Sequence, residues 1–202
     1  MGRPSKKEER IEEILNAFYR CVARYGIDGS TLERIADESG LKRSLVRHFA
    51  GNREELESML VDRVLEQSQQ QWSGFIESLP TKESKENCKK SCTELLLEGL
   101  FSDQYSDGEY ILVIESLIFS AGRDAALRQR MQAWMQGFTD DITFILQGQF
   151  PKADNARLEA VSFGLISLYF NLDSLAPLGM NQQYRQPARS AAEYLLNSLS
   201  TD

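Results

Sequence analysis

Residues 25–56 read YGIDGSTLERIADESGLKRSLVRHFAGNREEL, and this stretch predicts two short helices joined by a turn. Ser30 and Glu33 have the spacing of a capping box, in which both side chains bind backbone N–H groups at the start of a helix. Gly40 is expected to end that helix, because glycine adopts the left-handed conformation without strain. A second short helix follows, so the stretch has the helix-turn-helix pattern.

The second of these helices has an apolar face and a basic face. Leu45, Val46 and Phe49 recur at the spacing of one helix face, and we expect them to pack inward. The residues on the opposite face are Arg43, Ser44, Arg47 and His48. An α-helix fits the DNA major groove, where arginine bonds guanine bidentately and lysine or histidine near the rim takes phosphates. The pattern therefore predicts a DNA-reading face; the alternative is a solvated charged surface.

Charge is divided unevenly along the 202 residues. The whole chain has a net charge of −7, but residues 1–53 carry +3 and residues 54–202 carry −10. Residues 42–53 contain no acid, and their basic side chains are Lys42, Arg43, Arg47, His48 and Arg53. A short basic segment on an acidic protein indicates a confined anionic partner.

Other residue counts argue against several classes of protein. The three cysteines, Cys21, Cys88 and Cys92, have no disulfide-framework or zinc spacing, which favours a reducing cytoplasm. The chain has a single histidine, which argues against a Ser-His-Asp or Cys-His catalytic site and against a metal site with several histidine ligands. The longest apolar run, residues 110–114, is far shorter than a membrane span. We therefore expect a cytoplasmic protein that is not an enzyme and has no metal, cofactor or membrane partner.

The rest of the chain also has helical periodicity, so the predicted fold class is all-α. Ser5 and Glu8 form a capping box before a helix that Gly26 closes, and a long helix follows Asn52. Further helices are expected at 82–101, 109–121, 124–147, 155–175 and 187–199. We predict a helix-turn-helix DNA-binding domain in residues 1–51 and a larger helical domain in residues 52–202.

Residues 25–56 resemble the TetR family of bacterial transcriptional repressors without a gap. The positions that carry the resemblance are Gly26, Ser30-Thr31, Ile35-Ala36, Gly40-Leu41, Phe49 and Arg53 to Leu56. Four positions depart from the family pattern. Arg47 replaces a phosphate-contacting tyrosine, Lys42 a small hydroxyl residue, Ser44 a glycine and Ala50 a common aromatic.

The resemblance implies further contacts with DNA. Ser30 and Thr31 would place a hydroxyl or backbone N–H group against phosphate, and Arg53 would do the same from the start of the long helix. The alternative for Ser30 is helix capping alone. Arg3, in a flexible start, can enter a narrow minor groove; the alternative is an arm without a fixed contact.

The resemblance also implies a C-terminal ligand-binding domain. The aromatic residues that could line an apolar effector pocket are Phe101, Tyr105, Tyr110, Phe119, Trp134, Phe138 and Phe170. Glu115 and Asp173 are the polar candidates, since a buried carboxylate needs a partner. The alternatives are ordinary core packing for the aromatic residues, and an arginine partner or plain exposure for the carboxylates.

The last two helices, at 155–175 and 187–199, have broad apolar faces. Such faces could form a four-helix interface between two copies of the chain, and the alternative is packing within one chain. Together these observations predict a homodimeric, ligand-responsive repressor that binds a pseudopalindromic double-stranded DNA operator and is released by a small-molecule effector. Two other hypotheses stay open. One is an activator or ligand-insensitive DNA-binding protein of the same fold, and the other is a helical adaptor that binds a protein partner.

Overall fold

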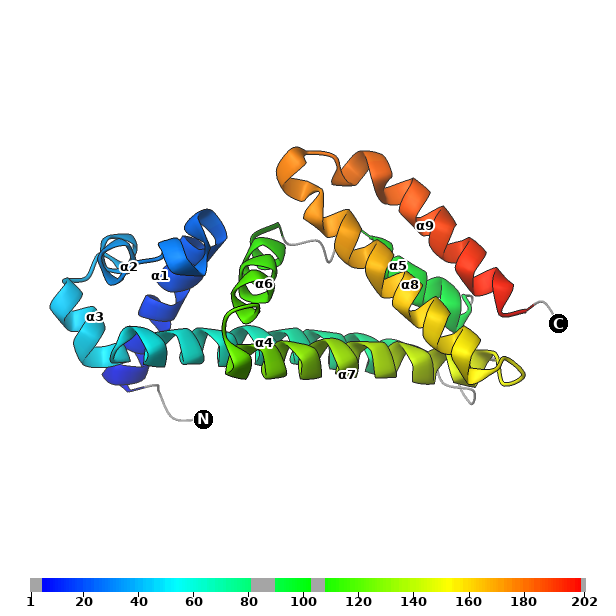
Figure 1. The fold of residues 1–202 in the computed structure, drawn as a ribbon, viewed down its shortest axis with the longest axis horizontal. Helices are drawn as coiled ribbons and strands as arrows, with labels where there is room; N and C mark the ends of the chain where they lie inside the picture. Colours follow the sequence, from blue (N-terminus) through cyan, green and yellow to red (C-terminus); the bar gives the residue numbers. More distant parts are fainter. Residues whose placement is uncertain (1–4, 81–89, 103–107, 201–202) are drawn as a thin grey trace. The chain divides into compact units, whose positions relative to one another are not determined.

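The computed structural model describes residues 5–80, 90–102 and 108–200, and every regular element in these ranges is a helix (Figure 1). The predicted all-α class is therefore confirmed. The chain divides into two compact units, one of residues 1–70 and 109–131, the other of residues 71–108 and 132–202. The predicted boundary at residue 51, between a DNA-binding domain and a larger helical domain, stays a prediction.

The first unit contains the helix-turn-helix. Its elements are α1 (Lys6–Gly29), α2 (Leu32–Ser39), α3 (Arg43–Ala50), the first part of α4 (Arg53–Ser78), α6 (Gly108–Ala121) and the start of α7 (Ala125–Gln149). The predicted capping box is present at the start of α1, where the Ser5 hydroxyl accepts from the Glu8 N–H and the Glu8 carboxylate accepts from the Ser5 N–H. The first three helices pack against one another (Figure 1).

Two glycines shape this unit. Gly40 has φ +68°, and its N–H group bonds the carbonyls of Ala36 and Asp37, which ends α2 as predicted. Gly26 has φ +70° and ψ 170°, a conformation open almost only to glycine. It breaks the helical geometry of α1, but the helix resumes and extends to Gly29.

The second unit is built around a single apolar core. Its elements are the end of α4, α5 (Cys92–Phe101), the rest of α7, α8 (Asn155–Ser174), the short 3-10 helix η3 (Ala176–Leu178) and α9 (Asn181–Ser198). Helix α9 packs against α8 and α5. The fully buried side chains of this core include Leu96, Ile142, Leu146, Leu158 and Leu165.

Two helix starts differ from the prediction. Helix α5 begins after Ser91, which forms a capping box with Glu94; residues 82–89 of the expected helix lie outside the described residues. Helix α9 begins at Asn181, not at residue 187, and Pro187 lies inside it. Proline removes one backbone hydrogen bond there without ending the helix.

The stretch Asn155–Leu178 is long and apolar enough, with a mean hydropathy of 1.2, to meet the length and composition test for a membrane span. Core helices of water-soluble proteins pass the same test. In this structure Leu158, Leu165 and Leu172 of this stretch belong to the apolar core of the second unit, which gives the high hydropathy a structural reason.

Candidate nucleic-acid interface

Helix α3 presents a basic surface to solvent. Val46 is fully buried and Ala50 is 3% exposed, so these two residues anchor the helix. The exposed residues at the start and along the outer side of the helix are Lys42, Arg43, Ser44, Leu45, Arg47 and His48. The four residues expected on the outer face therefore lie there, and we call this set of six residues the α3 surface.

The cations of the α3 surface have no acidic partner. Among the residues that the structure describes, no carboxylate lies within ion-pair distance of Lys42, Arg43 or Arg47. Some arginines elsewhere in the same unit do have an acidic partner: Arg20 and Arg24 both bond Glu38, at 2.6 and 2.9 Å. These bonds hold the pKa of the Glu38 carboxyl below its ordinary value, the hydrogen bond from Arg20 being the largest cause. The positive potential of the α3 surface is therefore not compensated locally.

The expectation for Leu45 is wrong. Its side chain is 40% exposed, whereas the sequence pattern placed it inward with Val46 and Phe49. The inward stripe of α3 runs through Val46 and Ala50, four residues apart, with Phe49 half-buried beside them. Alanine is too small to mark this face by hydrophobicity, which is why the pattern assigned the stripe to leucine instead.

The expectation that Ser30 starts α2 is also wrong. Thr31 is the N-cap residue, and its hydroxyl accepts from the Arg34 N–H at 3.3 Å. Ser30 is fully buried at the end of α1, where its hydroxyl donates to the Gly26 carbonyl at 2.7 Å. Burial keeps this hydroxyl away from a phosphate, while Thr31 is exposed at the start of α2.

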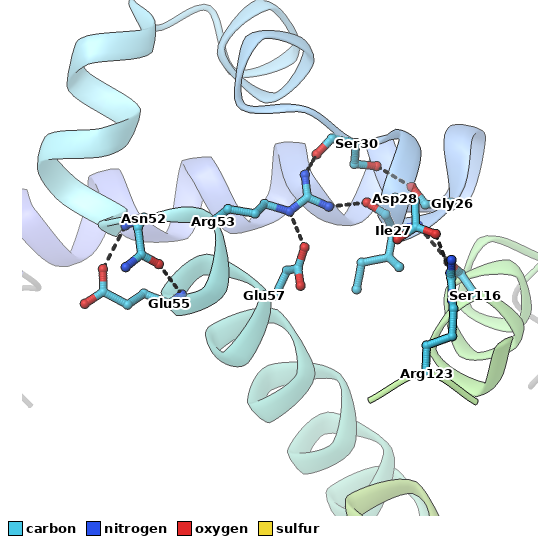
Figure 2. Close-up of polar contacts among 10 residues, drawn as sticks. All are labelled: Gly26, Ile27, Asp28, Ser30, Asn52, Arg53, Glu55, Glu57, Ser116 and Arg123. Atoms are coloured by element: carbon cyan, nitrogen blue, oxygen red, sulfur yellow. Dashed lines mark hydrogen bonds and ion pairs between the residues drawn. The ribbon is translucent and has the colours of Figure 1, made fainter. Parts of the chain in front are cut away.

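Arg53 lies at the start of α4 and bonds groups within its own unit (Figure 2). Its guanidinium donates to the carbonyls of Ile27 and Ser30 and to the Glu57 carboxylate. The same group lies 5.3 Å from the centroid of the Phe18 ring. Its side chain is 28% exposed. The structure therefore shows Arg53 linking α1 to α4 through hydrogen bonds, whereas the sequence predicted a phosphate contact for it.

Helix α6 also contacts the end of α1 (Figure 2). The Ser116 hydroxyl accepts from the backbone N–H of Ile27 at 2.8 Å, directly after the break at Gly26. Arg123, just after α6, forms an ion pair with Asp28. Ser116 was not among the residues expected to matter, because a serine in an apolar helix gives no signal in the sequence of a distant backbone partner.

The residues expected to line an effector pocket fall into both units. Tyr110, Glu115 and Phe119 belong to the first; Phe101, Trp134, Phe138, Phe170 and Asp173 belong to the second. Tyr105 and Arg3 lie outside the described residues.

Three of the expected pocket residues contact one another in the second unit. The ring centroids of Trp134 and Phe170 are 5.7 Å apart, and those of Phe138 and Phe170 are 6.1 Å apart. Trp72, Phe75 and Tyr169 also belong to this aromatic cluster, with the ring centroid of Trp72 4.1 Å from that of Phe138 and 5.5 Å from that of Phe75. These three residues were not expected in a pocket, although the periodicity of the long helix that begins after Asn52 reaches Trp72. Phe101 is buried in the core of the same unit.

Phe119 contradicts its expected place in a pocket. Its side chain is 73% exposed, and the Arg123 guanidinium lies 5.3 Å from its ring centroid. Ile114 and Leu117 form the buried side of α6, and this turns Phe119 toward solvent. The Tyr110 hydroxyl bonds Ser68 at 2.8 Å.

The two carboxylate candidates have different surroundings. Asp173 is 6% exposed near the end of α8 and has an interaction partner. Glu115 is only half-buried on α6, so part of its carboxylate remains hydrated. Asp173 therefore fits the expectation of a buried carboxylate that needs a partner better than Glu115 does.

A hollow in the first unit has a different lining from the expected apolar pocket. It lies between α1 and α4 and is lined mainly by charged and amide side chains: Glu12, Leu15, Met59, Asp62, Arg63, Glu66, Gln67 and Gln70. None of the residues expected to bind an effector is among them.

No family model matches the chain. It is 40% identical over 48 residues to the HTH-type transcriptional repressor AcnR of Corynebacterium jeikeium. That match covers 24% of this chain and spans about a quarter of the relative's length.

Solved structures resemble the chain over nearly its whole length. A TetR-family transcriptional regulator from Streptomyces coelicolor has a TM-score of 0.74 at 16% identity and covers 96% of this chain and 97% of its own. One from Cytophaga hutchinsonii has a TM-score of 0.73 at 15% identity and covers 98% of both chains. One from Haloarcula marismortui has a TM-score of 0.70 at 19% identity, with 94% and 97% covered. This protein has the fold of the TetR-family transcriptional regulators.

Proposed function

We propose that this protein is a TetR-family transcriptional regulator that binds duplex DNA through the α3 surface. One observation carries the proposal: the exposed cations of a helix-turn-helix have no acidic partner among the described residues. Basic side chains that approach phosphates release condensed counterions, and this term supplies much of the affinity for DNA. The fold supports transcriptional regulation, and the 48-residue match to a named repressor supports repression as the mode.

The start of α3 is suited to a phosphate. Lys42 is the N-cap residue and makes no side-chain capping bond, so the first backbone N–H groups of the helix lack a side-chain acceptor. A phosphate oxygen fits such groups, because the helix dipole favours negative charge at this end. Arg43 and Arg47, on the outer side of the same helix, have the donors that read guanine in the major groove.

Charge reversal tests this proposal. Arg43→Glu and Arg47→Glu should each abolish or strongly weaken retention of fluorescent duplexes from a random-sequence pool, measured across a salt series. Lys90→Glu is the matched control, because it makes the same charge change in the second unit, where Lys90 pairs with Glu98. Equal binding by all four proteins, or binding that does not depend on salt, would refute DNA binding by the α3 surface.

We further propose that two copies associate through α8 and α9. Phe163 on α8 is 69% exposed and Tyr194 on α9 is 77% exposed. A Cβ atom at Gly164 would lie 2.7 Å from Leu195, so Phe163 and Tyr194 are each next in sequence to a residue at a close contact between these two helices. Large exposed aromatic side chains on paired helices favour an interface between protein chains. A dimer would present two α3 helices to successive major grooves.

The aromatic cluster of the second unit is the proposed place of effector binding. Trp72, Trp134, Phe138, Tyr169 and Phe170 supply apolar and polarisable surface, and Asp173 is a buried acidic group of the same unit. Aromatic surface of this kind suits a small molecule with an apolar body. An effector releases DNA only if it binds one conformation of the dimer more tightly than the other. Mass spectrometry of small molecules that copurify with the protein would identify it.

A further inference from the structure

Leu45 stands out on the α3 surface because it has no donor or acceptor. Its side chain is 40% exposed, and the residues one turn away on the same helix face, Lys42 and His48, are exposed as well. The anchoring of α3 is done by Val46 and Ala50 on the other side of the helix. Leu45 is therefore an apolar group in the middle of a surface whose other exposed members are polar or cationic.

The major groove of DNA offers one apolar group to such a side chain. Guanine, cytosine and adenine present hydrogen-bonding atoms at the groove edge, and thymine adds the C5-methyl group. Leucine cannot satisfy a base donor or acceptor, so placing it against guanine or adenine leaves polar atoms without partners. A thymine methyl is the base-edge group that leucine contacts without that cost.

We infer that Leu45 packs against the C5-methyl group of a thymine in each half-site and thereby selects thymine at that position. This inference rests on the proposed DNA binding by the α3 surface. Lys42 and the start of α3 are the proposed phosphate contacts and Arg43 and Arg47 the proposed guanine contacts, so Leu45 adds a sequence preference without adding charge. Its removal should therefore alter base selection and leave the number of phosphate contacts unchanged.

Uracil substitution tests the contact directly, because uracil differs from thymine only by the missing methyl group. A duplex is first selected from a random-sequence pool with the wild-type protein. Each thymine is then replaced singly by uracil, and the dissociation constant is measured at fixed salt. For the wild-type protein we expect one thymine per half-site at which uracil weakens binding about fourfold, the effect of one buried methyl group.

Three variants complete the experiment. Leu45→Ala should bind the thymine and uracil duplexes equally while keeping the wild-type salt dependence, and Leu45→Met, which keeps an apolar side chain, should retain a preference for thymine. Arg43→Ala is the matched control: its overall binding weakens, but the roughly fourfold preference at this thymine remains. Amide hydrogen exchange of α3 checks that each variant is folded.

Two results would overturn the inference while leaving DNA binding intact. The first is a wild-type protein that tolerates uracil at every thymine of the selected duplex. The second is a Leu45→Ala protein that keeps the same sensitivity to uracil as the wild type. A wild-type protein that selects no duplex from the pool is a third, separate result; it refutes the proposed function and the thymine contact together.

Discussion

Replacing Arg53 by alanine should lower the stability of the first unit, because Arg53 bonds groups within that unit. The substitution removes the donors to the carbonyls of Ile27 and Ser30 and the partner of Glu57. A hydrogen bond from a charged donor contributes about 1.5–3 kcal/mol, and an exposed ion pair four residues apart on a helix adds about 0.3–0.5 kcal/mol. Because the Arg53 side chain is 28% exposed, we take the lower value for each carbonyl bond and expect a loss of about 3 kcal/mol.

Amide hydrogen exchange is the suitable assay for this change. Both tryptophans, Trp72 and Trp134, belong to the second unit, so their fluorescence does not report directly on the first. A loss of about 3 kcal/mol accelerates exchange through global opening of this unit about a hundredfold. Arg43→Ala is the control, since it removes an exposed arginine without an ion pair among the described residues; its effect should stay within about 0.5 kcal/mol. Arg53→Lys should recover part of the loss, because lysine lacks the planar fork of donors.

The opposite pattern would refute this account of Arg53. If Arg53→Ala left hydrogen exchange unchanged and lowered the slope of DNA affinity against salt concentration by about one, its main role would be a phosphate contact. That result would support the role implied by the family resemblance and would make the observed contacts with Ile27 and Ser30 energetically minor.

If two copies associate as proposed, Phe163→Glu should give a monomer in light scattering, whereas Phe144→Glu, which changes a phenylalanine on α7 that is at least as exposed, should leave a dimer; dimers in both variants would contradict an interface at Phe163. Because the folded-state pKa of Glu38 lies below the ordinary value of 4.5, its stabilising contribution is present above that pH and is lost as the pH falls through the folded-state pKa. Glu38→Gln should therefore flatten the acid side of the stability curve, and an unchanged curve would contradict the pairing with Arg20. Gly26→Ala should lower the free energy of unfolding by about 1–3 kcal/mol, while Gly137→Ala, in open helical space on α7, should raise it by about 0.5–1 kcal/mol. Urea denaturation of the two glycine variants measures these changes. A gain in stability from Gly26→Ala would refute the prediction that alanine is strained at this positive φ.

The fold class followed from local signals in the sequence. Capping residues such as Ser5, and the helix-ending Gly40, depend on neighbours within a few positions, so a sequence pattern can reveal them. The outward placement of Arg43 and Arg47 followed in the same way, because charged side chains avoid burial without a partner.

Features that depend on distant parts of the chain could not be read in this way. Leu45 is exposed because Ala50, a residue with little hydrophobic signal, occupies the inward face. Arg53 turns inward because carbonyl acceptors lie at the end of α1, and their positions follow from the whole fold of the unit. Trp72 joins the aromatic cluster through a ring contact with Phe138, which is 66 positions away along the chain.

The break at Gly26 turns the end of α1 into a junction between two other helices. The non-helical conformation there coincides with an Ile27 N–H group that bonds Ser116 of α6 and an Ile27 carbonyl that bonds Arg53 of α4. A displacement of α6 or α4 therefore changes a hydrogen bond of the same residue, next to the buried Ser30 that leads into α2. Rigid packing transmits such displacements because close-packed interiors have few alternative arrangements. Within the first unit, the backbone of Ile27 is therefore a point at which contacts from both α6 and α4 meet the end of α1.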